Sequence, residues 1–444
     1  MDIRELSGIM RENGVVGAGG AGFPSYAKLN AEADTILLNC AECEPLLKLH
    51  RQLFGAYPEE ILETFSQIVQ AVGAKEGVIG IKSEYRETIR AVRTHIDRFP
   101  ELRIHELPGV YPMGDEVVLI YECTGRRIRP GGLPIEQGVI VYNVETVFNV
   151  WRGMRKATPV VDKLVTIVGE VKKPVTLRVP LGTPLSELVE RAGGALVKRP
   201  AFLVGGPMMG RFGSPSDPVT KTTNALLVLP EEHYLIQRMK APVSIDLKRA
   251  ASICCQCRMC TDLCPRHALG HPIEPHLFMR SAANQDYQQA EVFLNTFFCC
   301  SCGLCELYSC PQGLAPRTLI TEYKNRLRAK GVKAPQGVQP GPADSAREYR
   351  KAPEKRLEAR LGLSRYDVPA PLEDETIRVK KVLIPMAQHI GAPAKPCVAA
   401  GDTVLRGQRI GEPGQGLSVP VHASISGRVA EVTERGIVIT EEVR

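Results

Sequence analysis

Eight of the fourteen cysteines of this chain fall into two short runs with the spacing of iron-sulfur ligands. The runs are Cys254, Cys257, Cys260 and Cys264, followed by Pro265, and Cys299, Cys302, Cys305 and Cys310, followed by Pro311. The first run matches C-x2-C-x2-C-x3-C-P, in which three thiolates surround one cluster and the fourth cysteine ligates the other. The second run has four residues before its last cysteine. We therefore expect an electron carrier with two 4Fe-4S clusters, one held by Cys254, Cys257, Cys260 and Cys310 and the other by Cys299, Cys302, Cys305 and Cys264.

Structural zinc and disulfide bonds are the other uses of closely spaced cysteines. Zinc sites more often show two separated C-x2-C pairs, and two complete triplets are hard to explain in that way. Disulfides form in oxidising compartments, and the segment Met1–Glu5 does not begin a signal peptide. We therefore expect reduced thiols, a cytoplasmic protein, and packing roles for Cys255 and Cys300.

The composition is that of a folded protein with several domains. The length of 444 residues suggests about three domains, and a hydrophobic content of 44% is ample for their cores. No run of about 18 uncharged apolar residues is present, so we expect no membrane-spanning segment. The formal net charge is +7, and much of it lies in Lys324–Arg360. We interpret that stretch as a solvated linker. A docking surface for an acidic partner is the alternative, and nucleic-acid binding has little support.

Strand and helix patterns divide the chain into successive modules. An α/β domain is predicted over residues 1–155, from helical spacing at Pro58–Val72 and Tyr85–Phe99 and strand-like runs at Thr35–Leu38, Gly77–Ile81, Leu102–Leu107 and Val139–Tyr142. A β-grasp module is predicted over residues 160–232, where two strand-like runs precede a helix with Thr183 as N-cap and Pro184 at its first position. A ferredoxin-like cluster domain then occupies 245–330, and a basic, proline-rich linker occupies 331–375.

The C-terminal module, residues 376–444, is predicted to be a β sandwich. Its half-motifs Val398–Val404 and Val421–Val429 resemble a biotinyl/lipoyl-type domain. Such carrier domains present a modified lysine on the hairpin between the halves, whereas the last lysine of this chain is Lys395. No swinging arm can be attached there, so we expect a structural or docking module.

A second candidate site is the glycine-rich segment Gly17–Pro24, whose backbone amides could approach a phosphate without side chains in the way. It fits G-x-G-x-x-G, and Glu42 lies 20 residues beyond Gly22, as in a Rossmann nucleotide site. The segment before it has helical rather than strand spacing, however, and Pro24 follows the last glycine almost at once. At this point an ordinary tight turn remains the alternative.

The glycine loop and three later motifs resemble the flavin site of the NADH-binding subunit of respiratory complex I. The matching segments are Gly19–Pro24 with Lys28, then Asn39–Pro45, Tyr111–Glu116 and Asn143–Thr146. The resemblance implies FMN held by Gly17, Gly19, Gly20, Gly22, Lys28, Asn39, Asp115, Glu116 and Asn143, with NADH near Phe23, Glu42 and Glu44. The chain departs from that family at Tyr142, where complex I has a second asparagine, and at Cys40 and Ala41.

Several of these residues also have a plainer interpretation. Glu42 and Glu44 could form ion pairs with Lys28, Lys48 or Arg51, which lie close in the sequence. Cys40 and Cys43 form a C-x-x-C, but without a thioredoxin-like context packing thiols are favoured over a redox dithiol. In the β-grasp module, Gly205–Gly210 is either a close-approach loop or a surface turn.

The whole set of modules resembles the RnfC component of the Rnf membrane electron-transport complex and, still more, the cobalamin reductases of the propanediol-utilisation microcompartment, where the sandwich is also C-terminal. The resemblance implies an NADH-dependent oxidoreductase that passes electrons through FMN and two clusters to cobalamin, a corrin-dependent enzyme or an adenosyltransferase. It also implies microcompartment shell proteins as further partners and a location inside the microcompartment. An Rnf-type protein that delivers electrons to a membrane complex, and a flavin-free iron-sulfur scaffold, are the alternatives.

Overall fold

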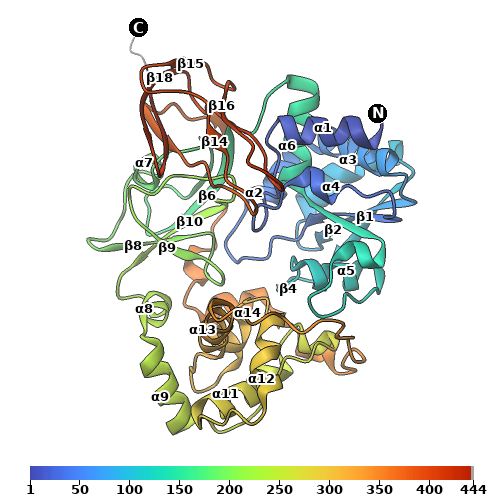
Figure 1. Ribbon diagram of the computed structural model, residues 1–444, viewed down its shortest axis with the longest axis vertical. Coiled ribbons are helices and arrows are strands. Elements are labelled where there is room, and N and C mark those ends of the chain that lie inside the picture. The colour runs from blue at the N-terminus through green and yellow to red at the C-terminus, as the bar shows by residue number, and fades with distance from the viewer. Residues whose placement is uncertain (442–444) are drawn as a thin grey trace.

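The N-terminal α/β domain is a parallel sheet with helices on both faces (Figure 1), within a computed structural model that describes residues 1–441. Its strands are β1 Thr35–Cys40, β2 Glu76–Lys82, β3 Leu102–Leu107 and β5 Val139–Asn143, and its helices are α1 Ile3–Glu12, α2 Leu49–Ala56, α3 Pro58–Val72, α4 Arg86–Arg93, α5 Glu116–Thr124 and α6 Val144–Lys156. The strand order is β3-β2-β1-β5, with every neighbouring pair parallel. Side chains alternate along β1, so that Ile36 and Leu38 pack with α1, α2, α3 and α6, whereas Leu37 packs with α5.

Local sequence explains where these helices begin and end. α3 starts with proline at its first turn and stops at Gly73, whose φ of 77° is left-handed. The helix predicted over Tyr85–Phe99 is interrupted, because α4 ends at Arg93 and a separate 3-10 turn covers Ile96–Arg98. The Thr94 hydroxyl donates to the Ala91 carbonyl at 2.6 Å, which competes with continued helix.

The β-grasp module is a mixed six-stranded sheet with the order β12-β7-β6-β10-β8-β9. Its strands are β6 Asp162–Gly169, β7 Val175–Pro180, β8 Pro200–Val204, β9 Arg211–Gly213, β10 Ala225–Pro230 and β12 Leu372–Thr376, and its helix is α7 Leu185–Arg191. The helix packs on the sheet through Leu185 and Leu188. Pro184, not Thr183, is the N-cap, because the Thr183 hydroxyl donates to the Pro180 carbonyl at 2.8 Å and closes the preceding turn.

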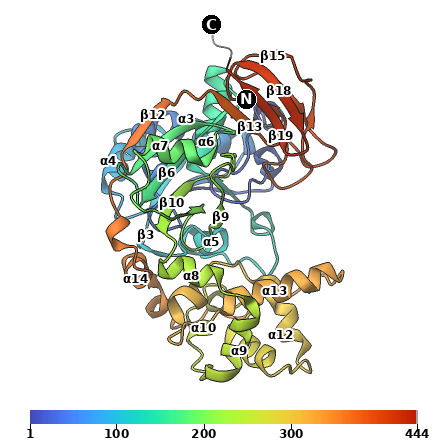
Figure 2. The ribbon, with the colours of Figure 1, turned by 90° about the vertical axis from the view of Figure 1, so that its left-hand side faces the viewer.

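The cluster domain is helical and lies at the end of the molecule farthest from the C-terminal sandwich (Figures 1 and 2). Its helices are α8 Tyr234–Lys240, α9 Val243–Ile253, α10 Met259–Asp262, α11 Pro275–Ala283, α12 Ala290–Leu294 and α13 Pro316–Ala329. They enclose a small core that includes Phe278, Met279, Leu319 and Ile320. Of all the helices described between residues 1 and 441, none is long and apolar enough to cross a membrane.

The segment 331–375 differs from the solvated linker that its composition suggests. It contains β11 Ala352–Pro353, which pairs with β4 Val110–Tyr111, and α14 Glu354–Arg360, and it ends in β12 of the β-grasp sheet. Leu357, Leu361 and Leu363 are buried in the main core. Many of its charges are paired, as in Lys351 with Glu122 at 3.0 Å. The difference arises because apolar residues that can be buried lie between the basic ones. The overall composition of the segment does not reveal them.

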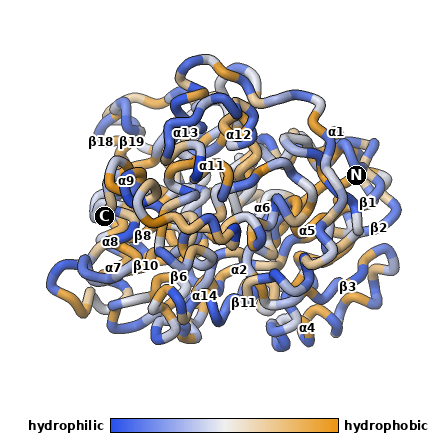
Figure 3. The backbone as a smooth tube through the Cα atoms, turned by 90° about the horizontal axis from the view of Figure 1, so that it is seen from below, coloured by the Kyte–Doolittle hydropathy of each residue, from blue (hydrophilic) through white to orange (hydrophobic). Residues whose placement is uncertain are grey.

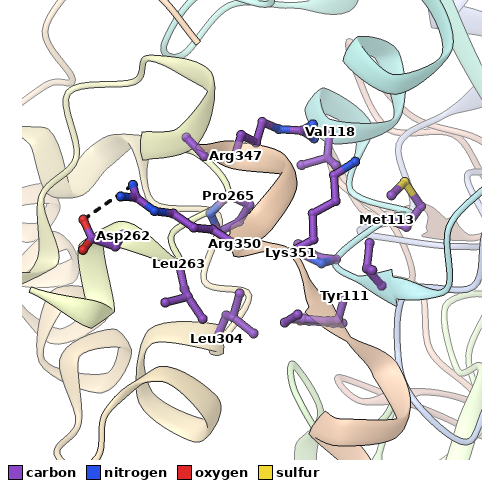
Figure 4. A pocket seen from close by; sticks show the side chains of 14 residues that line it. Tyr111, Met113, Val118, Asp262, Leu263, Pro265, Leu304, Arg347, Arg350 and Lys351 are labelled. Carbon is purple, nitrogen blue, oxygen red and sulfur yellow. Dashed lines mark ion pairs between the residues drawn. The ribbon is translucent and has the colours of Figure 1, made fainter. Parts of the chain in front are cut away.

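A cavity at this junction shows three parts of the chain meeting (Figure 4). Its lining includes Tyr111, Met113 and Val118 from the α/β domain, Leu263, Pro265 and Leu304 from the cluster domain, and Arg347, Arg350 and Lys351 from the segment 331–375. Arg350 lies 3.8 Å from Asp262 of the cluster domain. The segment 331–375 therefore helps to hold the cluster domain against the α/β domain.

The C-terminal module is a sandwich of two small antiparallel sheets that packs beside the α/β and β-grasp modules (Figure 1). Its strands are β13 Lys381–Ile384, β14 Lys395–Pro396, β15 Thr403–Val404, β16 Arg409–Glu412, β17 Val421–His422, β18 Gly427–Thr433 and β19 Gly436–Thr440. Val382, Ile384, Ile410, Val421 and Ile439 form its core. Gly22 of the glycine loop lies against this module, because a Cβ on Gly22 would be 3.1 Å from the Cα of His389.

Candidate redox site

The structure gathers the cysteines into two cavities within the cluster domain. The first, here the Cys254 cavity, is lined by Cys254, Cys257, Cys260 and Cys310, with Cys255, His276, Met279 and Leu314 among the other residues. The second, the Cys299 cavity, is lined by Cys299, Cys302, Cys305 and Cys264, with Cys300, Arg266, Ile273 and Arg317 among the others. Each cavity thus combines three cysteines of one run with the last cysteine of the other, which is the arrangement that the spacing predicts.

The two cysteine loops share the same backbone course. The residues two and four positions after the first cysteine have left-handed φ in both: Gln256 at 53° and Arg258 at 66°, Ser301 at 58° and Gly303 at 80°. Within residues 1–441, no group of three His, Cys, Asp or Glu side chains is arranged around a single metal ion. The thiols of each cavity instead line a shared space from several directions.

Several N–H groups point at the cysteine sulfurs, as expected around thiolates. Ser301 N lies 3.3 Å from Cys299 Sγ, and Leu314 N lies 3.4 Å from Cys310 Sγ. Hydrogen bonds of this kind tune cluster potentials. Burial raises the pKa of the Cys264 thiol to about 12, so iron binding has to supply the free energy that removes its proton. The donor set therefore fits iron-sulfur clusters.

The Cys299 cavity adjoins the α/β domain through two direct contacts. Arg266, which lines the cavity, donates to the Asp115 carboxylate at 2.8 Å. The Tyr111 hydroxyl donates to the Cys302 carbonyl at 2.5 Å. Asp115 is one of the predicted flavin residues, so the predicted flavin site and the predicted cluster site are joined by a single ion pair.

The glycine loop is held open as a cradle of backbone. Gly17 N donates to the Phe23 carbonyl at 2.9 Å, which closes the loop, and Ala18 N donates to the Thr146 hydroxyl at 3.0 Å. A Cβ on Gly19 would lie 2.6 Å from the Asn143 side chain, so no larger residue fits there, whereas Gly20 has open space around it. The loop is therefore shaped so that backbone, not side chains, would meet a ligand.

The predicted polar flavin residues converge at the carboxyl ends of β1 and β5. Asn39 and Asn143 are paired in register across these strands. Asn39 donates to the Gly114 carbonyl at 3.0 Å, and Lys28 lies 3.1 Å from Glu116. Asp115 and Asn143 are also the N-caps of α5 and α6, and their side chains accept hydrogen bonds from backbone amides in the first turn of these helices. Ligands of open α/β sheets bind at this edge, so the residues fit a flavin phosphate and ring system.

The region around Glu42 is buried and incompletely hydrogen-bonded. Glu42 Oε1 accepts from the His50 amide at 2.9 Å, while Glu42 Oε2 lies 3.6 Å from Arg51 and lacks a hydrogen-bond partner among the described residues. The ion pair with Arg51 is the plainer interpretation given above, and the Glu42 side chain is only 1% exposed. The Tyr142 hydroxyl donates to the Ser25 carbonyl at 3.1 Å.

Glu44 binds the β-grasp module. Its carboxylate accepts from Met208 N at 2.7 Å and from Met209 N at 2.8 Å. A Cβ on Gly206 would lie 2.5 Å from Glu44 Oε2, so the loop Gly205–Gly210 approaches Glu44 closely, while its Met209 side chain is 53% exposed. Burial raises the pKa of the Glu44 carboxyl to about 7. Both oxygens of the Glu44 carboxylate therefore accept hydrogen bonds from backbone amides, and the role of Glu44 at NADH stays a prediction.

Sequence reasoning missed residues that connect the modules. Arg266, Tyr111 and Met208 place the Cys299 cavity against the α/β domain and the β-grasp loop, since Met208 O also accepts from Arg317 at 3.4 Å. Tyr111 and Met208 lie in segments named above and Arg266 directly follows Cys264-Pro265, but none of these motifs indicates the contacts between modules. The C-x-x-C thiols Cys40 and Cys43 are both free, and burial raises the pKa of each.

Four family models match successive parts of the chain. They describe a Nuo51 FMN-binding domain at residues 10–152, an SLBB domain at 164–212, a 4Fe-4S dicluster domain at 253–315 and an RnfC barrel sandwich hybrid domain at 370–444. These matches confirm the predicted fold class, with its flavin domain, iron-sulfur domain and C-terminal sandwich. Flavin and iron-sulfur cofactors belong to such domains.

The most informative relatives span nearly the whole chain. Cobalamin reductase PduS of Citrobacter freundii is 42% identical over 440 residues, which is 99% of this chain and 97% of the relative. Cobalamin reductase PduS of Salmonella typhimurium is 43% identical over 441 residues, 99% of this chain and 96% of the relative. The chain belongs to the cobalamin reductase PduS family. It is therefore an oxidoreductase, and the predicted resemblance is confirmed.

A more distant relative shares part of the PduS-type chain. It is the RnfC-type component of the Na(+)-translocating ferredoxin:NAD(+) oxidoreductase complex of Acetobacterium woodii, 31% identical over 273 residues, 60% of this chain and 59% of the relative. This agrees with the predicted similarity to the RnfC component of the Rnf complex. The PduS family accounts for far more of the chain.

Proposed function

We propose that the protein is an NADH-dependent flavo-iron-sulfur reductase that delivers single electrons to cobalamin or to a corrin-holding partner. The observation that carries the proposal is the ion pair of Arg266 with Asp115, at 2.8 Å, because it joins the predicted flavin site to the Cys299 cavity. Full-length similarity to cobalamin reductases supports cobalamin as the acceptor. When bound, FMN would accept hydride from NADH, and two 4Fe-4S clusters would carry electrons one at a time.

The chain's own residues position these groups. Gly17–Gly22 and the N-terminus of α6 would hold the flavin phosphate through backbone amides and the helix dipole. Lys28, Asn39, Asp115, Glu116 and Asn143 would surround the remainder of the flavin, and Phe23 and Glu42 would lie near NADH. The eight cysteines of the two cavities would ligate the clusters. Arg266 and Tyr111 would hold the two sites against each other through their contacts with Asp115 and Cys302.

The proposal extends to partners and location. A corrin-dependent enzyme or an adenosyltransferase would use the reduced cobalamin, and shell proteins would enclose the set in a bacterial microcompartment. The propanediol-utilisation resemblance, together with the relatives named cobalamin reductase PduS, supports this placement. The electrons would end on a corrin, directly or through a partner protein, and not on a membrane complex.

An anaerobic titration tests the donor and acceptor. The protein is reconstituted with FMN and iron, titrated with NADH while flavin bleaching and cluster signals are recorded, and then mixed with cob(III)alamin. We expect NADH to reduce flavin and clusters, and corrin reduction to exceed that of free FMN with NADH. Corrin reduction equal to that free-flavin control would remove cobalamin from the proposal, and the absence of flavin bleaching would remove NADH.

An Rnf-type electron-input protein is the second candidate, supported by the RnfC barrel sandwich hybrid domain at residues 370–444. It predicts reduction by NADH without corrin turnover and copurification with membrane partners. A flavin-free scaffold predicts that the denatured protein releases no FMN. FMN release is measured on the protein as purified, before any FMN is added, and corrin turnover is measured in the titration.

A further inference from the structure

The two cysteine cavities differ in their surroundings. The Cys299 cavity contacts the α/β domain through Arg266 and Cys302, and Gly303 in its loop lies against the β-grasp loop, where a Cβ would be 3.3 Å from Met208 O. In contrast, the hydrogen bonds and ion pairs described for residues 254–260 all stay within the cluster domain. The carbonyl of Cys310, the fourth cysteine of the Cys254 cavity, accepts from Arg360 of α14, but no hydrogen bond or ion pair described within residues 1–441 joins the four cysteines of this cavity to the α/β domain.

Solvent exposure follows the same division. Cys264, Cys302 and Cys305 of the Cys299 cavity are buried. Around the Cys254 cavity, Cys257 is exposed, and so are Ile253 at 43% and Met259 at 41% on either side of it. Figure 3 views the molecule from this end, with α9, α11, α12 and α13 in front. Exposed apolar side chains beside a redox centre are a feature of contact surfaces.

The exposed charged residues of α9 and of the loop that follows it are basic. Within Val243–Cys260 the exposed charged residues are Lys248, Arg249 and Arg258, all basic. The one acidic residue of that stretch, Asp246, is buried and paired with Arg238 at 2.8 Å. Asp262, just beyond it, is 3.2 Å from Arg258 and offsets one of these charges in part. A positive rim around an apolar centre therefore faces solvent.

We propose that electrons leave through the exit surface, defined as Lys248, Arg249, Ile253, Cys257, Arg258 and Met259, and that an acidic redox protein docks there. The order of transfer is then flavin, cluster of the Cys299 cavity, cluster of the Cys254 cavity, acceptor protein. This direction rests on the proposed function. The match between the basic surface and an acidic partner does not rest on the proposed function, because it is the same whichever donor reduces the clusters.

A macromolecular partner fits this surface better than a free corrin does. Several like charges spread over α9 and the following loop act together on a partner that carries an extended acidic patch, and they steer its approach at low ionic strength. A small corrin meets only one or two of them at a time. Contacts of this kind are small and transient in electron transfer.

The test uses dithionite-reduced, cluster-loaded full-length protein, so NADH and FMN are not needed. Cytochrome b5 serves as an acidic acceptor, cytochrome c as a basic acceptor, and cob(III)alamin as a free corrin. In each case one electron leaves a reduced cluster, which is oxidised, and reduces the iron or cobalt ion of the acceptor. The test variant carries Lys248→Glu, Arg249→Glu and Arg258→Glu. The control carries Arg86→Glu, Arg90→Glu and Arg93→Glu on α4, with the same change in net charge.

We expect the test variant to reduce cytochrome b5 about tenfold more slowly than the parent at low salt, and the control to stay within about twofold. The difference should shrink as salt rises, and cytochrome c should be reduced faster by the test variant. Iron content confirms that both variants hold clusters, and a Lys248→Gln, Arg249→Gln, Arg258→Gln variant should give an intermediate rate. Equal rates in test and control variants, or a loss confined to cob(III)alamin, would overturn the exit surface. A failed NADH titration leaves this result untouched, so the two proposals fail separately.

Discussion

The two cysteine loops have the same spacing and the same left-handed positions, yet they lie in opposite environments. The loop from Cys299 to Cys305 is packed between the α/β domain and the β-grasp loop, whereas the loop from Cys254 to Cys260 is largely exposed at the far end of the cluster domain. The internal geometry that wraps a cluster is therefore common to both. What differs is the set of neighbours, and the proposed order of electron transfer rests on that difference.

The neighbours also differ in kind. Beside the Cys299 cavity, Arg266 is paired with a largely buried carboxylate, Asp115, and its side chain is 14% exposed. Beside the Cys254 cavity, Arg258 is paired with Asp262 and its side chain is 51% exposed. An arginine thus forms an ion pair between two domains beside the Cys299 cavity and an exposed ion pair within one domain beside the Cys254 cavity. Each can be removed separately, which makes the comparison testable.

Removing one cluster at a time gives the largest expected effect. In Cys302→Ala, NADH should reduce the flavin but neither the remaining cluster nor an acceptor protein, because the first step of the path is lost. In Cys257→Ala, the cluster of the Cys299 cavity should still be reduced by NADH while acceptor reduction falls to background. Electron paramagnetic resonance of the NADH-treated proteins checks both. Reduction of the Cys254-cavity cluster in Cys302→Ala would reverse the proposed order.

Replacing each of the two arginines should show that Arg266 contributes more to the free energy of unfolding than Arg258 does. Arg266→Met leaves the Asp115 charge without its partner in a protein-enclosed site and should cost about 3 kcal/mol. Arg258→Met removes an exposed ion pair and should cost less than about 1 kcal/mol. Thermal unfolding of cluster-loaded protein measures both changes. Similar shifts in the two variants would mean that Arg266 does not hold the domains together.

The sequence could predict the parts of the molecule that depend on local pattern. The exchange of Cys264 and Cys310 between cavities follows from spacing alone, and the cavities gather those cysteines as expected. Likewise the four strand-like runs predicted for the α/β domain coincide with β1, β2, β3 and β5, and the structure adds that β1 and β5 pair so that Asn39 and Asn143 lie side by side. Such features are set by residues near one another in the chain or by motifs with a fixed geometry.

Contacts between distant segments could not be predicted in this way. Nothing in the spacing indicates that Glu44 accepts the amides of Met208 and Met209, 164 and 165 residues away. The segment 331–375 looked like a linker because its basic residues dominate its composition, although Leu357 and Leu361 bury it in the core. Which partner satisfies a buried group is decided by the packing of whole modules.

The contact at Glu44 should depend on pH, unlike the exposed loop. Burial raises the pKa of Glu44 from 4.5 to about 7. A carboxyl whose pKa is raised by folding contributes its full stability below pH 4.5, and that contribution is lost as pH rises through 7. Hydrogen exchange at the Met208 and Met209 amides, corrected for the intrinsic rate, should therefore speed up by about tenfold across this window.

Glu44→Gln provides the control, because glutamine keeps an acceptor and cannot ionise. In that variant the protection of the two amides should no longer change between pH 5 and 8. The residues from Cys254 to Cys260 should show no matching change in either protein. A pH effect of equal size in Glu44→Gln would assign it to another group.

The smallest expected effects come from the backbone that the two loops share. Four residues after the first cysteine, one loop has Gly303 and the other has Arg258, both with left-handed φ. Gly303→Ala should cost about 1–2 kcal/mol, because a residue with a Cβ is strained there. Its Cβ would also lie 3.3 Å from Met208 O. Arg258→Gly should instead stabilise the protein by about 0.5 kcal/mol by relieving that strain, despite the loss of an exposed ion pair. Urea unfolding of the cluster-loaded protein measures both, and changes of the same sign would show that environment outweighs the shared backbone even at this position.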